Sequence, residues 1–251
     1  IVLLAVTPFF FKSKIIQRIK SEANKSLNAK LDFSNNVGLN LFSHFPKVSI
    51  TLNDLSVTGK DEFEGDTLIY ARQLQLAVDL KALWDTREIP IRKLYAADPL
   101  INITYHKNGK ANYDIFISDS SSQDTSHTRL KIKFDVYELK NGRINYDDQQ
   151  LGFYTFLSGV DHLGSGNFDD MVFDLKTKTD IKELTLGYGG VRYLDHVKTF
   201  IDAVLHMDLN TYRFEFKNNL IGINDMACAV NGFVALPNDD DIEMDLELKN
   251  N

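Results

Sequence analysis

From about Leu31 to its end, this chain alternates apolar and polar residues with a period of two. Successive side chains of a β-strand point to opposite faces of a sheet, so this alternation predicts strands with one apolar and one polar face. At least eight runs follow the pattern, and their more apolar parity consists of these residues: Val48, Ile50, Leu52; Leu68, Tyr70, Arg72, Leu74, Leu76, Val78, Leu80; Ile101, Ile103, Tyr105; Ile132, Phe134, Val136; Met171, Phe173, Leu175; Ile201, Ala203, Leu205, Met207; Tyr212, Phe214, Phe216; Met226, Cys228, Val230; Ile242, Met244, Leu246, Leu248.

Turn residues separate these runs. Asn108-Gly109 and Asn141-Gly142 are typical of tight hairpins, and Gly189-Gly190 gives a third turn. Because short connections join antiparallel neighbours, we expect a meander of long antiparallel strands. Its apolar face must be covered either by a second sheet, which would make a sandwich, or by a ligand with apolar surface of its own.

The first residues differ from the rest of the chain. Ile1 to Phe11 carries no charge, and Lys12, Lys14, Arg18 and Lys20 follow it. Eleven residues of helix span about 16 Å, roughly half of a bilayer core. We interpret this stretch as the trailing half of a transmembrane anchor, formed by Ile1, Val2, Leu3, Leu4, Val6, Phe9, Phe10 and Phe11. A buried strand or the remnant of a signal peptide is the alternative.

An amphipathic helix is expected from about Ser13 to Asn28. Ile15, Ile19, Ala23 and Leu27 recur every fourth residue, and charged residues occupy the other positions. Such a stripe suits a helix that lies on the sheet or along a membrane surface.

Charge and composition exclude several functions. The chain has a net charge of −7, and its basic residues are scattered, which argues against nucleic acid as a partner. The six histidines show no metal-ligand spacing, and we identify no catalytic, metal-binding or cofactor-binding motif. The sequence therefore predicts a protein that is not an enzyme.

The order of short segments along the chain resembles the AsmA family. The closing segments resemble versions found in Bacteroides-type bacteria. The resemblance covers nearly the whole chain and rests on these segments: 45–48 (FPKV), 50–59 (ITLNDLSVTG), 63–68 (FEGDTL), 90–94 (PIRKL), 98–101 (DPLI), 108–114 (NGKANYD), 139–148 (LKNGRINYDD), 164–168 (GSGNF), 224–225 (ND) and 230–234 (VNGFV).

The resemblance implies an inner-membrane protein with one N-terminal anchor and a body in the periplasm of a Gram-negative bacterium. It implies an elongated, twisted antiparallel sheet that forms an apolar, chorein-like groove and binds or conducts phospholipid between the envelope membranes. Outer-membrane or periplasmic envelope proteins are the further partners that we expect. If the more apolar parity lines the groove, its residues are Val48, Ile50, Leu52, Leu74, Leu76, Val78, Ile101, Ile103, Ile132 and Phe134.

The expected organisation has four parts. Residues 1–11 are the anchor remnant, 12–117 an N-terminal helix and β module, 118–126 a flexible polar loop, and 127–251 the continuing β-groove.

Two other functions stay open. The first is a non-catalytic structural factor for outer-membrane assembly, with the apolar face closed by a second sheet. The second is a β-sandwich that binds polysaccharide through exposed aromatic residues, for which Trp84, Tyr95, Tyr188 and Tyr193 are candidates.

Overall fold

The computed structural model describes residues 16–17, 20–21, 24–25, 27–40, 47–79, 91–115, 136–167, 170–237 and 241–250. Within these ranges twelve strands form one sheet, and the single 3₁₀ turn is η1 (Asp61–Phe63). The strands are β1 (Ala29–Asp32), β2 (Gly38–Asn40), β3 (Lys47–Gly59), β4 (Thr67–Asp79), β5 (Ile91–Tyr105), β6 (Val136–Asp148), β7 (Phe153–Ser165), β8 (Val172–Tyr188), β9 (Val191–Asp208), β10 (Arg213–Ile223), β11 (Met226–Ala235) and β12 (Glu243–Asn250).

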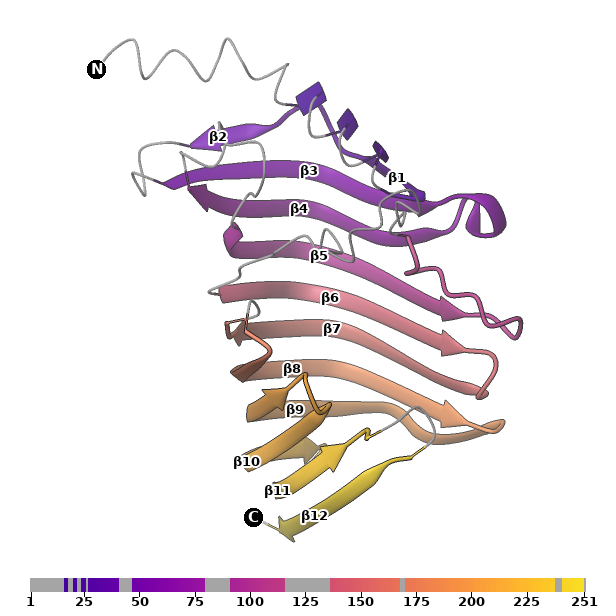
Figure 1. The fold of residues 1–251 in the computed structure, drawn as a ribbon, viewed down its shortest axis with the longest axis vertical. Coiled ribbons are helices and arrows are strands. Elements are labelled where there is room, and N and C mark those ends of the chain that lie inside the picture. Colours follow the sequence, from indigo (N-terminus) through magenta and orange to yellow (C-terminus); the bar gives the residue numbers. More distant parts are fainter. Residues whose placement is uncertain are drawn as a thin grey trace.

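From β3 onward the strands stack in chain order along the long axis of the molecule, while β1 and β2 both pair with β3 (Figure 1). The direction of the strands changes markedly from β9 to β12 (Figure 1), as expected of a strongly twisted sheet. The predicted mainly-β fold, one large twisted sheet, is confirmed. The described strands contain no second sheet, so the sandwich alternative is not what this part of the chain forms.

One neighbouring pair breaks the antiparallel pattern. β5 and β6 run parallel, and every other pair of neighbours in the described sheet is antiparallel. Between two parallel strands the chain must return to the end of the sheet at which the first strand began. The connection contains residues 116–135, which lie outside the described part of the chain, as does the predicted loop at 118–126. The strands on both sides of that loop belong to the same sheet.

The predicted turns have different outcomes. Gly189 and Gly190 join β8 to β9 as a two-residue hairpin loop, with φ values of 58° and 80°. Asn108-Gly109 also forms a turn, closed by a bridge between Tyr105 and Ala111. The hairpin predicted at Asn141-Gly142 is wrong, because both residues lie within β6. Asn141 does adopt the left-handed conformation expected of it (φ 53°), but in an irregularity of the strand.

Left-handed residues recur inside the strands. Asp54 in β3, Asp98 in β5, Asn141 in β6, Gly159 in β7 and His196 in β9 all have φ between 47° and 63°. The strand register brings Asp54, Arg72 of β4, Asp98 and Asn141 into line across the sheet. A left-handed residue interrupts the simple alternation of side chains. The apolar positions change parity where this line crosses the strands, and they do so in β4 as well, although Arg72 is not left-handed.

The N-terminal part of the described chain packs on the β3 end of the sheet. Residues 16–17, 20–21 and 24–25 are helical, but the predicted helix from 13 to 28 is not described as a whole. Ile16, Phe33 and Val37 form a buried cluster with Ile50 and Leu52. Residues 1–11, the predicted anchor, lie outside the described residues, and among the residues that are described no helix has the length and apolarity that a membrane span requires.

Candidate functional site

The first part of the candidate site is the apolar face of the sheet, which the register assembles strand by strand. At its β3 end, Ile50, Leu76 and Leu94 lie opposite one another on neighbouring strands. Three further rows continue the face: Leu52, Leu74, Ala96; Leu55, Ala71, Pro99; Val57, Ile69, Ile101. In β3 the buried residues therefore change from even numbers before Asp54 to odd numbers after it.

The same face continues to the last strand. Cross-strand pairs extend it through these residues: Leu139 and Ile144 of β6; Leu157 and Val160 of β7; Phe173, Leu175, Ile181, Leu184 and Leu186 of β8; Val197, Ile201, Ala203, Leu205 and Met207 of β9; Phe214, Phe216 and Ile221 of β10; Cys228, Val230 and Val234 of β11; Met244, Leu246 and Leu248 of β12. Most of these side chains are half-buried, whereas Met244 and Leu248 are 62% and 66% exposed. Half-buried apolar side chains are typical of a face that no second layer covers.

Six of the ten residues predicted to line a groove lie on this face. Ile50, Leu52, Leu74, Leu76 and Ile101 belong to its rows, and Ile103 continues the parity of Ile101 in β5. Val48 and Val78 are paired in the register of β3 and β4. Ile132 and Phe134 lie outside the described residues. Ile50 and Leu52 are 4% exposed under Phe33 and Val37, so the chain's own side chains cover the face at this end.

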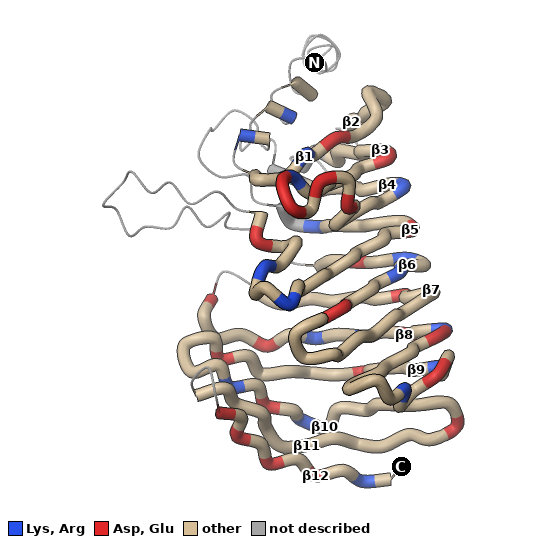
Figure 2. The backbone as a smooth tube through the Cα atoms, turned by 90° about the vertical axis from the view of Figure 1, so that its right-hand side faces the viewer, with Lys and Arg blue, Asp and Glu red and all other residues tan. Residues whose placement is uncertain are grey.

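The opposite face is polar and carries a network along the line of left-handed residues. Arg72 Nε donates to Asp98 Oδ2 at 2.6 Å, and Asn141 Nδ2 donates to Asp98 Oδ1 at 2.6 Å. Hydrogen bonds from Asn141 and from Arg72 hold the pKa of Asp98 below its ordinary value. Asp161 accepts from the backbone N–H of Asn141 at 2.8 Å and also binds the ammonium group of Lys140. Charged residues of both signs are interspersed over the height of the sheet (Figure 2).

A polar cluster interrupts the apolar face between β6 and β8. It consists of Tyr137, His162, Thr177 and Thr179, which we call the histidine cluster. Thr179 Oγ1 lies 2.8 Å from His162 Nδ1, and Thr177 Oγ1 lies 3.4 Å from both atoms. The ring of Tyr137 lies over Gly164 and 5.0 Å from the imidazole, centroid to centroid. Sequence reasoning missed this cluster, although the run Thr177-Lys178-Thr179 puts hydroxyls at the apolar parity of β8.

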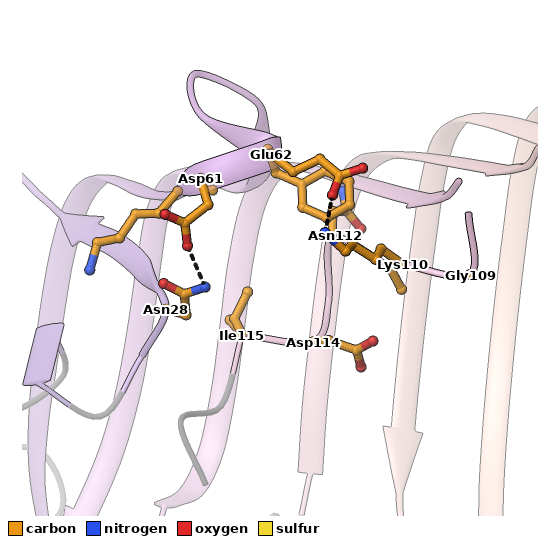
Figure 3. A pocket seen from close by; sticks show the side chains of 12 residues that line it. Asn28, Asp61, Glu62, Gly109, Lys110, Asn112, Asp114 and Ile115 are labelled. Atoms are coloured by element: carbon orange, nitrogen blue, oxygen red, sulfur yellow. Dashed lines mark hydrogen bonds and ion pairs between the residues drawn. The ribbon is translucent and has the colours of Figure 1, made fainter. Parts of the chain in front are cut away.

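A separate polar pocket of about 270 Å³ lies where η1 meets the Asn108-Gly109 turn (Figure 3). Two of its contacts are drawn there: Asn28 Nδ2 donates to Asp61 Oδ2 at 3.0 Å, and Lys110 Nζ donates to Glu62 Oε2 at 2.6 Å. Hydrogen bonds from Lys110, Asn108 and His106 lower the pKa of Glu62 to about 2. These charged groups partner one another, so the contacts fasten the turn to η1.

No group of three or more His, Cys, Asp or Glu side chains in the described ranges is placed to hold a metal ion. The features that organise the described surface are therefore the apolar face, the polar network behind it and the histidine cluster.

Together the fold and the site define a mainly-β protein with a long single sheet, of which one face is apolar and the other polar. The family model described as AsmA family matches residues 1–162, which is more than half of the chain. The chain belongs to the AsmA family, and the family resemblance is confirmed over residues 1–162; the Bacteroides-type detail of the closing segments stays a prediction. Searches of curated proteins and of solved structures found no match. Membership of this family is consistent with a lipid-related role in the cell envelope.

Proposed function

We propose that this protein binds phospholipid along the apolar face and carries it between the envelope membranes. The observation that supports this most directly is the apolar face that extends from β3 to β12, interrupted by the histidine cluster, with half-buried side chains and no second sheet among the described strands. An apolar face that no second sheet covers is typical of a surface that binds an apolar partner.

The energetics suit acyl chains. Each methylene that leaves water contributes about 0.8 kcal/mol, and this contribution requires no specific geometry. Half-buried side chains of the apolar face, such as Leu157, Leu184 and Leu205, can therefore hold an acyl chain at many neighbouring positions. The charged headgroup would stay at the rim in water, because the apolar face offers it no ion pairs among the residues of its rows.

The buried cluster that contains Ile16, Phe33 and Val37 limits the part of the apolar face that a lipid can occupy. Because Phe33 and Val37 cover Ile50 and Leu52, and Leu74 and Leu76 of β4 pack against the same cluster, we expect a lipid to occupy the sheet from about β5 toward β12. In this proposal the segment Ile1–Phe11 anchors the protein in the inner membrane, and the sheet extends from it into the periplasm.

A non-catalytic role in outer-membrane assembly is the second candidate. It is favoured by the last strand, where Met244 and Leu248 are 62% and 66% exposed. A partner protein could pack on these side chains as readily as a lipid could. For polysaccharide binding, Tyr188 and Tyr193 are exposed beside the Gly189-Gly190 turn, Tyr95 is only half-exposed and Trp84 lies outside the described residues.

The proposal can be tested with two neighbouring residues of β7. Leu157 is half-buried on the apolar face, and Phe156 is 45% exposed on the polar face. Native mass spectrometry of the purified chain, after incubation with phospholipid vesicles, should show bound lipid in the wild type and in Phe156→Asp. It should show several-fold less in Leu157→Asp, and Leu184→Asp, on the neighbouring strand, should behave in the same way.

Circular dichroism and thermal unfolding check that each variant folds. If Leu157→Asp does not fold, a phospholipid with a photoreactive acyl chain can be used on the wild type. Cross-links should then map to Leu157, Leu184 and other residues of the apolar face, and not to Phe156. A folded wild-type protein that takes up no lipid would exclude the lipid proposal and favour the assembly role.

A further inference from the structure

The histidine cluster contains a polar atom without a partner. His162 lies on the apolar face of β7, opposite Leu139 of β6 and Thr179 of β8. Its Nδ1 is engaged by the threonine hydroxyls, but its Nε2 is shielded from solvent and has no hydrogen-bond partner among the described residues. A buried donor or acceptor that stays unpaired loses its hydration without compensation, so such atoms are usually satisfied by a ligand or by water.

The hydroxyls beside His162 bear on the hydrogen-bonding role of Nε2. Thr177 Oγ1 lies 3.4 Å from Thr179 Oγ1, which lies 2.8 Å from His162 Nδ1. These distances allow a hydrogen-bonded chain in either direction, and we take the one in which Thr177 donates to Thr179 and Thr179 donates to Nδ1. Neutral imidazole has one donor and one acceptor nitrogen, so Nδ1 as acceptor leaves the proton on Nε2. Burial lowers the pKa of His162, which favours the neutral form.

The surroundings select a neutral acceptor. The residues that flank His162 on this face are Tyr137, Leu139, Val160, Gly164, Thr177, Thr179 and Ile181, and none of them is charged. A phosphate or a carboxylate would have no counter-charge among these neighbours and would lose its hydration there. An ester carbonyl oxygen accepts a hydrogen bond, carries no charge and is attached directly to an acyl chain.

We propose that the histidine cluster is a binding site for the ester carbonyl of an acyl lipid, with His162 Nε2–H as the hydrogen-bond donor. This inference rests on the proposed function. It adds that the apolar face recognises the glycerol end of the lipid at one position, the histidine cluster. In this proposal Tyr137 covers the binding site. Its half-buried ring lies against the imidazole and over Gly164, and a bound lipid would displace it.

The experiment compares two lipids that differ only in the carbonyl groups. The full chain is incubated with vesicles that contain equal amounts of dioleoyl-phosphatidylethanolamine and its diether analogue, and native mass spectrometry gives the ratio of the two bound lipids. One hydrogen bond to the carbonyl should give the wild type roughly a three- to tenfold preference for the diester. His162→Phe should bring the ratio close to one, and His162→Gln, which keeps a donor, should retain part of the preference.

Leu157→Ala is the control for the apolar face, because it should lower the binding of both lipids and leave their ratio unchanged. If His162→Phe does not fold, the imidazole nitrogen shifts of the wild type give the answer: the Nε2 signal should move on binding the diester and not on binding the diether.

The possible failures can be told apart. Lipid bound without any preference for the diester would overturn the ester-binding site, would make water the partner of Nε2, and would leave the lipid proposal standing. A wild-type protein that binds neither lipid would overturn both.

Discussion

Asn141 of β6 donates a hydrogen bond from Nδ2 to Oδ1 of Asp98 of β5 at 2.6 Å, and both residues have left-handed backbones, with φ values of 53° and 47°. This bond joins the one parallel pair of strands in the described sheet. In both strands the residues that face the apolar side change between even and odd numbers at this point. The bond therefore holds the two irregularities level with each other.

The first prediction concerns the backbone at Asn141. Asn141→Gly keeps access to the left-handed region and loses the hydrogen bonds of the side chain, which should cost about 1 kcal/mol. Asn141→Val loses the same bonds and adds the strain of a β-branched residue at positive φ, about 1 to 2 kcal/mol more. Urea unfolding measures both. Equal losses for the two variants would mean that the left-handed backbone at this position is not required.

The second prediction concerns pH. The pKa of Glu62 is lowered to about 2 in the folded chain, and an unfolded glutamate titrates near 4.5. Between these values the unfolded state binds more protons, so the contribution of Glu62 to stability is fully present above about pH 4.5 and is lost as the pH falls toward 2.

Thermal unfolding of Glu62→Gln tests this. The variant should melt below the wild type at pH 7, and the difference should shrink between pH 4.5 and pH 2. Glu64→Gln, on the same turn, is the control for the loss of one negative charge. A difference that does not change with pH would contradict the assignment.

The third prediction concerns an aromatic ring that covers a glycine. A Cβ atom added to Gly187 of β8 would overlap the ring of Tyr154 on β7, its direct cross-strand partner. Gly187→Val should therefore cost about 1 to 3 kcal/mol through overpacking. The double variant Gly187→Val with Tyr154→Ala should lose less stability than the sum of the losses of the two single variants, because the clash is gone. Strictly additive losses in urea unfolding would show that the ring does not occupy this place.

The fourth prediction concerns the N-terminal cover of the apolar face. Phe33 is 4% exposed and packs with Val37 and Ile50, so Phe33→Ala should cost about 3 to 5 kcal/mol. Met244→Ala, at a position 62% exposed on the same face, should cost less than about 0.5 kcal/mol. A loss of less than about 1 kcal/mol for Phe33→Ala, measured by chemical denaturation, would mean that this segment does not close the β3 end.

The alternation of residues was sufficient to predict the class of fold. The run Val48, Ile50, Leu52 and the run Leu74, Leu76 were assigned to one face, and the register places the described members of both runs on it. In the β4 run the prediction is wrong at Tyr70, which was put on the same parity as Leu74: Tyr70 pairs with Ser56, and its hydroxyl donates to Asp54 on the polar side. The parity of β4 changes at Arg72, level with the left-handed Asp54 and Asp98 of the neighbouring strands, and a period-two pattern contains no signal for such an irregularity.

The sequence by itself determined that the chain forms strands with one apolar and one polar face, because side-chain alternation is a local property of an extended backbone. It also carried the family resemblance. Only the tertiary structure decided that β5 and β6 run parallel, that the N-terminal segment covers Ile50 and Leu52, and that Asn141-Gly142 lies inside a strand. It alone brought His162 to Thr177 and Thr179. These features depend on which distant segments become neighbours. The free energy of strand pairing that selects those neighbours is a sum over the whole sheet, so the alternation within a single strand does not reveal it.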